Sequence, residues 1–363
     1  MNQLEGVKAR REPGIFRFFT PETPRGTLLT LGAVTLLLGT VGGLYLKWTG
    51  SRPDISELHL TRSSAQPQPV LKQVQAEAAN AVSISAGFLN DLYVLRSQEL
   101  CYYRLFDQSN GNLKIRQRFK MALEEEPTAS HFVMNSASPF YGKLFVAFSN
   151  KIMLFDSDEK AFIPFVHFED DSKITGIAVD SRDLFAADAG QGMILKVDHE
   201  MNLTRWGLPD QTTGFAGFQK GRYAFFDLDI DSQNETIYVT HPDQFRIEAF
   251  SGLDGHWIAE RSFEKRPLGA DDSEESFTGA ANPASVLLLG DGSFLTTDAG
   301  PEPDVKSWRN DGSFLAKIDE PAVTAPLAAD QAPLTSITFT EDRGVRLLIL
   351  LPTGRLVCLT VPP

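Results

Sequence analysis

The sequence predicts an all-β protein, a six-bladed β-propeller of four-stranded antiparallel blades, behind one N-terminal transmembrane helix. Three observations predict it. A phrase of two short apolar strands around a polar or glycine turn recurs after residue 85, an uncharged stretch of membrane-spanning length precedes these repeats, and no later segment shows a sustained helical period. The expected parts are a cytoplasmic segment (residues 1–26), a transmembrane signal anchor (27–47), a stalk (48–80) and the propeller (81–363).

The composition is that of a folded, acidic protein. Of the 363 residues, 42% are hydrophobic and 22% are charged, as in folded rather than disordered chains. The formal net charge of −13 excludes a nucleic-acid partner, because phosphates require clustered Lys and Arg side chains. Acidic runs at residues 124–126, 169–171 and 271–275 are expected at solvated loop tips.

An uncharged stretch, GTLLTLGAVTLLLGTVGGLYL, begins at Gly26 and ends at Leu46. As a helix it is about 31 Å long, enough to cross the hydrocarbon core of a bilayer. A cleaved signal peptide has a shorter apolar region that ends at a small-x-small site. This stretch is longer and runs into Tyr45, Lys47 and Trp48, so we expect an uncleaved signal anchor that holds the chain in the membrane.

The basic residues around this anchor predict its orientation. Five precede it, whereas only Lys47 and Arg52 follow it closely. The positive-inside rule therefore predicts a cytoplasmic N-terminus and an extracytoplasmic (periplasmic) propeller at the inner, or plasma, membrane. Gly39 and Gly43 form one G-x-x-x-G pair, but glycine is common in membrane helices, and we do not favour a helix-mediated dimer. The five preceding basic residues are Lys8, Arg10, Arg11, Arg17 and Arg25.

Residues 48–80 have the Ser, Gln, Pro and Ala content of an exposed stalk. A short helix is expected near residues 70–79. Residues 56–62, SELHLTR, alternate between apolar and polar side chains well enough to form a strand that joins the propeller.

The repeated phrase is clearest at residues 184–198, LFAADAGQGMILKVD. Each copy has an apolar strand, a polar or Gly/Pro turn, and a second strand that in most copies ends on a large apolar residue. These closing residues recur about every 40 to 60 positions, which indicates an array of supersecondary units that bury their faces against one another. In chain order they are Phe106, Phe155, Val197, Phe250, Trp308 and Leu359.

Further strands flank the copies, for example ITGIAVD (residues 174–180) upstream and LTRWGL (203–208) downstream. Four antiparallel strands in each of six units predict the propeller. The segment DLDID (227–231) has the alternation of a half-buried strand. It is not an EF-hand calcium loop, because the required Gly and Glu are replaced by Ser232 and Tyr238.

The second strand of several copies resembles the NHL-repeat propellers. Residues 245–250, FRIEAF, are close to that family's basic-Ile-x-x-Phe core, and residues 176–198 resemble a whole half-blade with Met193 in place of the usual basic residue. The resemblance covers roughly residues 85–363 and is clearest in the third to fifth units. It implies architecture more strongly than function, because such propellers include binding modules, lactonases and lyases.

In propellers of this type, the turn between the second and third strands of a blade opens onto the face where ligands usually bind. The polar residues at these positions are our candidate binding residues, and three of them, Asp188, His241 and Asp298, could converge near the central channel. The alternative is that Asp188 and Asp298 brace their own Asp-Ala-Gly turns. The matching positions are Arg96, Phe148, Asp188, His241, Asp298 and Leu351, of which Arg96, Asp188, His241 and Asp298 are the candidates.

Asp and His side chains would suit a metal ion such as Ca²⁺ or Zn²⁺. The resemblance implies that enzymatic members hold their metal with sets of His, or with Glu, Asn and Asp from separate blades. This chain has six histidines, and only His241 falls at the repeat position, so a three-histidine site is not expected. We therefore expect no cofactor, and a divalent metal remains the alternative.

The sequence has no G-x-S-x-G, Walker loop, dinucleotide fingerprint or C-x-x-C. Our main hypothesis is a membrane-anchored, extracytoplasmic NHL-type propeller that acts as a scaffold, binding a protein or another ligand with no chemistry of its own. The alternative is a metal-assisted hydrolase or lyase, lactonase-like, in the central channel.

Ring closure leads to two more expectations. The last strand, residues 355–363, is an inner or middle strand of its blade, so the outer strand must come from residues 56–62 or from the stretch around 82–85. Closure makes the units of Cys101 and Cys358 neighbours. Facing sheets lie about 10 Å apart, however, whereas a disulfide needs Cα atoms roughly 4.4–6.8 Å apart. We expect two largely buried thiols without a disulfide.

Overall fold

The computed structural model describes residues 70–75, 81–107, 113–218, 220, 226–266, 275–277, 282–290, 292–298, 304–318, 334–339, 345–351 and 354–361. The chain divides into two units, Met1–Arg52 and Pro53–Pro363. The first unit, with the expected anchor, lies outside the described residues, as does the strand expected at residues 56–62. No helix within the described ranges is long and apolar enough to cross a membrane.

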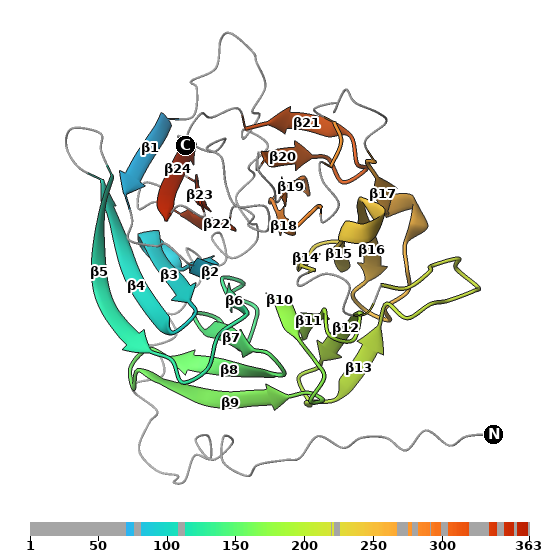
Figure 1. Ribbon diagram of the computed structural model, residues 1–363, viewed down its shortest axis with the longest axis horizontal. Coiled ribbons are helices and arrows are strands. Elements are labelled where there is room, and N and C mark those ends of the chain that lie inside the picture. The colour runs from blue at the N-terminus through green and yellow to red at the C-terminus, as the bar shows by residue number, and fades with distance from the viewer. Residues whose placement is uncertain are drawn as a thin grey trace, which may run out of the picture. The chain divides into compact units, whose positions relative to one another are not determined.

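Six four-stranded antiparallel sheets, the blades, are arranged around a common centre (Figure 1). The predicted all-β propeller with six blades is therefore confirmed. Blade 1 contains β2 (Ala81–Ala86), β3 (Asp91–Arg96), β4 (Glu99–Asp107) and β5 (Leu113–Ala122). Blade 2 contains β6 (Ala129–Phe132), β7 (Leu144–Phe148), β8 (Lys151–Asp156) and β9 (Ala161–His167). Blade 3 contains β10 (Ile174–Val179), β11 (Leu184–Asp188), β12 (Met193–Val197) and β13 (Leu203–Trp206).

The remaining blades follow the same order. Blade 4 contains β14 (Leu228–Asp231), β15 (Thr236–His241), β16 (Arg246–Ser251) and β17 (Phe263–Glu264). Blade 5 contains β18 (Ser285–Leu288), β19 (Phe294–Asp298), β20 (Asp304–Trp308) and β21 (Phe314–Lys317). Blade 6 contains β22 (Leu334–Phe339), β23 (Val345–Leu350), β24 (Arg355–Val361) and β1 (Val70–Gln75). Three short 3-10 segments, η1 (Phe88–Asn90), η2 (Pro242–Gln244) and η3 (Ala259–Arg261), complete the described elements.

The first strand of each blade lies innermost, and these strands contact one another in ring order from β2 to β22, with β2 also contacting β22 (Figure 1). Side chains of one inner strand bond to the backbone of the next. Asp229 Oδ2 accepts a hydrogen bond from Leu288 N at 2.7 Å, and Asp227 Oδ2 accepts one from Val286 N at 3.2 Å. Because an inner strand has no further strand to pair with, these contacts satisfy its backbone groups. Related contacts join Ser130 to Ser83 and Ser85, Thr175 to Phe226, and Ser336 to Ala86.

The strand that closes the ring comes from neither expected stretch. β1 pairs antiparallel with β24, with Val70 opposite Thr360 and Gln75 opposite Arg355. The helix expected near residues 70–79 is therefore wrong, because the open edge of β24 offers this segment a full ladder of backbone partners. Residues 82–85 belong instead to β2, the innermost strand of blade 1.

The closing residues of the repeat lie in the third strands and are buried, with one correction. Phe106 is 36% exposed. Tyr103 takes the equivalent position, since it pairs with Leu92 as Phe250 pairs with Ile237. β4 extends beyond β3, so Phe106 lies on the part of the β4–β5 hairpin that projects past the rest of blade 1. The buried closing residues in the other blades are Phe155, Val197, Phe250, Trp308 and Leu359.

Apolar side chains of facing blades form the core. Cys101 of blade 1 and Cys358 of blade 6 belong to the same buried cluster, together with Leu92 and Leu356. Both cysteines are buried and are not joined in a disulfide, as expected. The closure of the ring is thus held by apolar packing as well as by β1.

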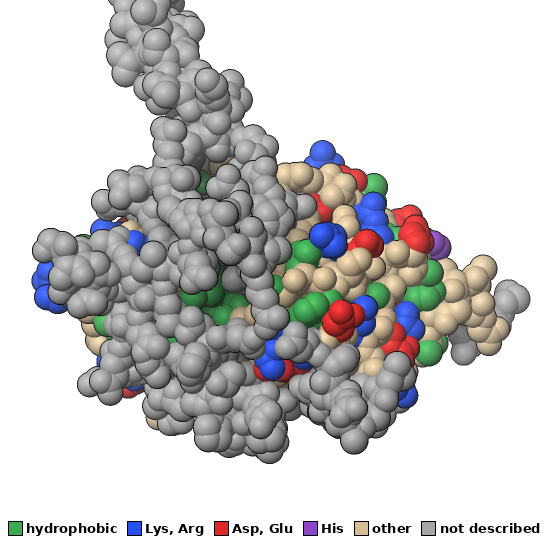
Figure 2. All heavy atoms as spheres, turned by 90° about the horizontal axis from the view of Figure 1, so that it is seen from above, with side chains coloured by type: hydrophobic (Ala, Val, Ile, Leu, Met, Phe, Trp, Pro, Cys, Tyr) green, Lys and Arg blue, Asp and Glu red, His purple; other side chains and the backbone are tan. Residues whose placement is uncertain are grey.

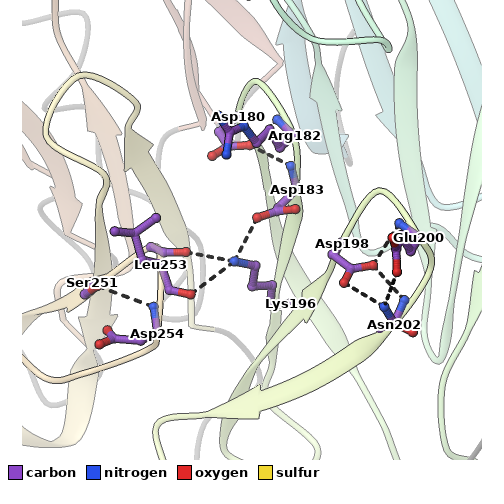
Figure 3. A network of polar contacts seen from close by, with 11 residues as sticks. Asp180, Arg182, Asp183, Lys196, Asp198, Glu200, Asn202, Ser251, Leu253 and Asp254 are labelled. Carbon is purple, nitrogen blue, oxygen red and sulfur yellow. Dashed lines mark hydrogen bonds and ion pairs between the residues drawn. The ribbon is translucent and has the colours of Figure 1, made fainter.

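A polar contact joins blades 3 and 4. Lys196 of β12 forms an ion pair with Asp183 at 2.8 Å and donates hydrogen bonds to the carbonyl oxygens of Gly252 (3.0 Å) and Leu253 (3.4 Å) in blade 4 (Figure 3). Its ammonium group lies 5.2 Å from the centroid of the Trp206 ring. Since the Lys196 side chain is only 13% exposed, it links the two blades with little screening by water.

Candidate functional site

The four candidate binding residues occupy equivalent positions in four blades. Arg96, Asp188, His241 and Asp298 are the last residues of β3, β11, β15 and β19, which are the second strands of their blades. They therefore lie on one face of the ring, which we call the loop face because the turns from second to third strands lie there. Antiparallel pairing puts the connection from each fourth strand to the next blade on this face as well.

These side chains point between blades rather than into the channel. Ile237 and Val239, alternate residues of β15, belong to one buried cluster with Phe185 of blade 3, and His241 follows at the next alternate position on the same face of the strand. His241 is 4% exposed, Asp298 is 1% exposed and Asp188 has no exposed surface. The three are thus buried in separate blades and do not form one cluster.

Asp188 braces its own turn. Its Oδ1 accepts hydrogen bonds from the backbone N–H groups of Lys173 (2.8 Å), Gly190 (3.0 Å) and Gln191 (3.0 Å). These bonds hold the turn after β11 against the segment that leads into β10. This geometry agrees with the alternative interpretation of the Asp-Ala-Gly turn, in which the carboxylate supports local structure.

His241 belongs to a buried network in blade 4. Its Nδ1 lies 3.1 Å from Glu248 Oε1, and Glu248 Oε2 accepts a hydrogen bond from Trp257 Nε1 at 2.8 Å. Arg246 Nε lies 3.2 Å from Glu248 Oε1. Burial alone would raise the pKa of Glu248, but the hydrogen bond with His241, the Arg246 charge and the Trp257 N–H group together lower it. Glu248 is therefore a carboxylate at neutral pH.

Aromatic residues from the connection between blades 3 and 4 cover this network. The Phe218 ring lies 4.8 Å from the His241 ring between centroids, and the Phe215 ring lies 6.3 Å from it. Phe215 also packs against Trp257 at 5.8 Å. The cover keeps water from the His241–Glu248 pair and ties the connection to blade 4.

Asp298 belongs to a second buried network, in blade 5. Lys306 Nζ lies 2.9 Å from Asp298 Oδ2 and 3.5 Å from Asp304 Oδ2, and it donates a hydrogen bond to the Ser276 carbonyl oxygen. Lys317 Nζ lies 2.7 Å from the other oxygen of Asp304. The Lys306 side chain is 1% exposed, so two carboxylates compensate a cation that water does not reach.

Glu248 and Lys306 were not among the residues predicted from sequence, although a signal for both exists. Each is the third residue of the third strand of its blade, two positions before a buried aromatic residue, Phe250 or Trp308. A charged residue in the buried part of a strand is unusual unless it is paired.

Arg96 differs from the other candidates. Its Nη1 lies 3.5 Å from Glu99 Oε2, its Nη2 donates to Tyr103 Oη at 3.3 Å, and its side chain is 20% exposed. Burial raises the pKa of Tyr103, so its phenol stays protonated and accepts the Arg96 hydrogen bond. Arg96 is thus the most accessible of the four candidates.

An ionisable group, Asp227, lies directly before the innermost strand of blade 4. Desolvation by burial, with a smaller contribution from the charge of Asp229, raises the pKa of Asp227 to about 7, while hydrogen bonds from the backbone of Val286 and Leu228 act in the opposite direction. A Cβ atom at Gly176 of β10 would lie 2.6 Å from Asp227 Oδ1, so only glycine leaves room for this carboxyl group. Residues 228–231 form a strand, as predicted, but the expected half-buried alternation is wrong, because Asp229 is buried between Leu228 and Ile230, at 7% exposure.

The described residues do not bring the candidate metal ligands together. Within the described ranges, no group of three or more His, Cys, Asp or Glu side chains is placed to hold a metal ion. Asp188, His241 and Asp298 face three different local networks, so their oxygen and nitrogen atoms do not converge.

The connections on the loop face differ in length around the ring. Those between blades 1 and 2 and between blades 2 and 3 are short, residues 123–128 and 168–173. Those that follow blades 3, 4 and 5 are long, residues 207–227, 265–284 and 318–333. In the described part of 207–227, Leu208 is 51% exposed. The acidic tips at residues 124–126 and 169–171 are exposed, as predicted, and Asp171 pairs with Lys220 at 3.0 Å.

No protein-family model and no curated protein matches the sequence. Solved structures do match. Virginiamycin B lyase from Staphylococcus aureus has a TM-score of 0.50 and 13% identity, over 80% of this chain and 99% of that one. A protein of unknown function from Bacteroides thetaiotaomicron VPI-5482 has a TM-score of 0.54 and 11% identity, over 81% of this chain and 73% of that one. At such low identity the likeness shows the propeller fold alone.

Proposed function

We propose that this chain is a membrane-anchored, extracytoplasmic NHL-type propeller that binds a protein or another ligand on its loop face. The observation that carries the proposal is the contrast on that face between buried networks and long connections. The networks of Asp188, His241 and Asp298 brace blades 3 to 5, and the chain segments that join each of these blades to the next are long. Long connections on a rigid scaffold are where binding surfaces of such folds are found.

Site-specific photo-crosslinking tests the binding face in intact cells. A crosslinking amino acid at Gln211, exposed on the loop face, is expected to capture a partner or ligand. The control is Gln233, equally exposed in the turn between β14 and β15 on the opposite face. Capture from position 233 alone, or equally from both positions, would contradict binding on the loop face.

The anchoring rests on the uncharged stretch from Gly26 to Leu46 and on the basic residues before it. A reporter fused to the C-terminus is expected to be active only outside the cytoplasm. A cytoplasmic signal, or a mature chain that lacks the first 46 residues, would refute the signal anchor.

One observation favours the second candidate, a metal-assisted hydrolase or lyase in the channel. Burial raises the pKa of Asp227, which directly precedes the first strand of blade 4, to about 7, as suits a general acid or base. Metal analysis of the purified full chain distinguishes the two candidates. A divalent ion that is bound in stoichiometric amount and survives dialysis would favour the enzyme.

A further inference from the structure

The outermost strand of blade 1 carries a cluster of cations that contrasts with the rest of the chain. β5 reads LKIRQRFKMA and contains four basic residues and no acidic one, in a protein whose formal net charge is −13. All four side chains, Lys114, Arg116, Arg118 and Lys120, are exposed. At the left edge of Figure 2, the side on which Figure 1 draws β5, the described charged side chains are mostly blue, whereas blue and red are mixed on the right.

Three of these cations are not neutralised by the acids around them. Lys120 pairs with Glu99, but Lys114, Arg116 and Arg118 form no ion pair with any side chain that the structure describes. Of the other two acids in the strands of this blade, Asp91 is held by Arg104 through two contacts of 2.6 and 3.0 Å, and Asp107 is the last residue of β4, so it offsets at most one of the three cations. The exposed edge of β5 therefore carries a net positive charge.

An exposed aromatic ring accompanies the cations. Phe106 of β4 is 36% exposed, and the Arg118 guanidinium carbon lies 5.5 Å from the centroid of its ring. Both lie on the β4–β5 hairpin, where β4 extends beyond β3. Exposed aromatic rings beside Lys and Arg are the combination that favours the interface between membrane and water.

The place where the chain enters the propeller points to the same surface. β1, which begins at Val70 within the segment expected to be the stalk, contacts β5 (Figure 1). A strand of this length spans only about 20 Å. Val70, the first described residue, therefore lies within about 20 Å of the contact between β1 and the strand that carries the cations.

We propose that the β4–β5 hairpin docks on anionic phospholipid headgroups of the membrane that anchors the chain. Lys114, Arg116 and Arg118 contact the phosphates, and Phe106 enters the interface. This inference rests on the proposed anchoring. Docking would add a second point of attachment to the tether and so hold the propeller in one orientation on the bilayer. Each cation near an anionic surface raises the docked-to-undocked ratio by a factor of about five.

The experiment uses the full chain in lipid nanodiscs with a fluorophore at Gln117→Cys. Gln117 is exposed and lies between Arg116 and Arg118, while Cys101 and Cys358 are buried and do not compete for the label. A lipid that carries a spin label on its headgroup quenches the fluorophore on contact. We expect strong quenching in discs of phosphatidylcholine and phosphatidylglycerol in equal parts, and little in discs of phosphatidylcholine alone. High salt should abolish the difference.

Two variants carry the same change in net charge. K114Q/R116Q/R118Q is expected to lose the quenching in anionic discs. K173Q/R205Q/K220Q removes three exposed cations elsewhere, two from connections on the loop face and one from β13. This variant is expected to keep the quenching. Equal quenching in the two lipids, or quenching that persists in the β5 variant, would overturn the docking.

Elution of the chain with the discs at high salt tests the anchor separately. A chain that does not elute with the discs contradicts the proposed anchoring. If the chain elutes with the discs but is quenched equally in anionic and neutral discs, the anchoring holds and only the hairpin docking is contradicted.

Discussion

Lys306 and Asp298 form an ion pair inside blade 5, with 2.9 Å between Nζ and Oδ2 and only 1% of each side chain exposed. Lys306→Met would leave Asp298 buried without its cation. We expect the free energy of unfolding to fall by about 3 to 5 kcal/mol, because removing one partner of a buried pair strands the other charge. Denaturant titration of the full chain in detergent measures this.

The double variant D298N/K306M is the control for that prediction. It removes both charges of the pair, so it should be clearly more stable than Lys306→Met alone. A single and a double variant of equal stability would show that the charge of Asp298 is not what the lysine compensates.

Asp227 should make stability depend on pH. Its pKa in the folded protein, about 7, lies above the ordinary value, so the fold favours the protonated form. The stabilisation is complete in acid and is lost as the pH rises through 7. Asp227→Asn keeps an oxygen for the Val286 N–H group but cannot ionise. We expect it to be more stable than the wild type at pH 8, on the order of a few kcal/mol, with the advantage shrinking toward pH 5. A difference in unfolding free energy between the two proteins that stays the same from pH 5 to pH 8 would contradict the prediction.

Asp188 is expected to act as a turn brace. Asp188→Ala removes the acceptor of three backbone N–H groups and should cost about 1 to 3 kcal/mol. Asp188→Asn keeps one acceptor oxygen and should cost less. If Asp188 only braces the turn, Asp188→Asn should also keep the crosslinking from position 211. Loss of that crosslinking in a stably folded variant would make Asp188 a ligand contact instead.

The ring should open when β1 is removed. Replacing residues 70–75 with a Gly-Ser segment of equal length leaves β24 with an exposed edge and weakens the contact of blade 6 with β5 of blade 1. We expect the unfolding free energy to drop by several kcal/mol, with a lower melting temperature. The same replacement at residues 56–61 is the comparison, and an equal loss there would mean that this segment also belongs to the ring.

The two cysteines should react only when the chain unfolds. Cys101 and Cys358 are buried and are not joined in a disulfide. A thiol reagent should therefore label neither in the native protein and both in denaturant without reductant. A denatured chain that reacts with no reagent, and whose mass is lower by two hydrogens, would show that the disulfide exists.

The repeated phrase by itself determined the fold class, the number of blades and the equivalence of Arg96, Asp188, His241 and Asp298. This was possible because each unit is local. Its strands, turn and closing apolar residue follow one another along the chain, and a sheet with two apolar faces can be buried only between neighbours of its own kind. The projecting end of β4 disturbed the pattern once, at Phe106, where an apolar residue does not mark a buried position.

Only the tertiary structure decided which residues these positions meet. Glu248 pairs with His241, and Lys306 pairs with Asp298. These pairs depend on the register of adjacent strands and on how deeply each side chain is buried. Neither can be read from the order of residue types. The closing strand was missed for a related reason. VLKQVQ has no strong strand alternation, and it becomes β1 because the edge of β24, far away in sequence, needs a partner for its backbone groups.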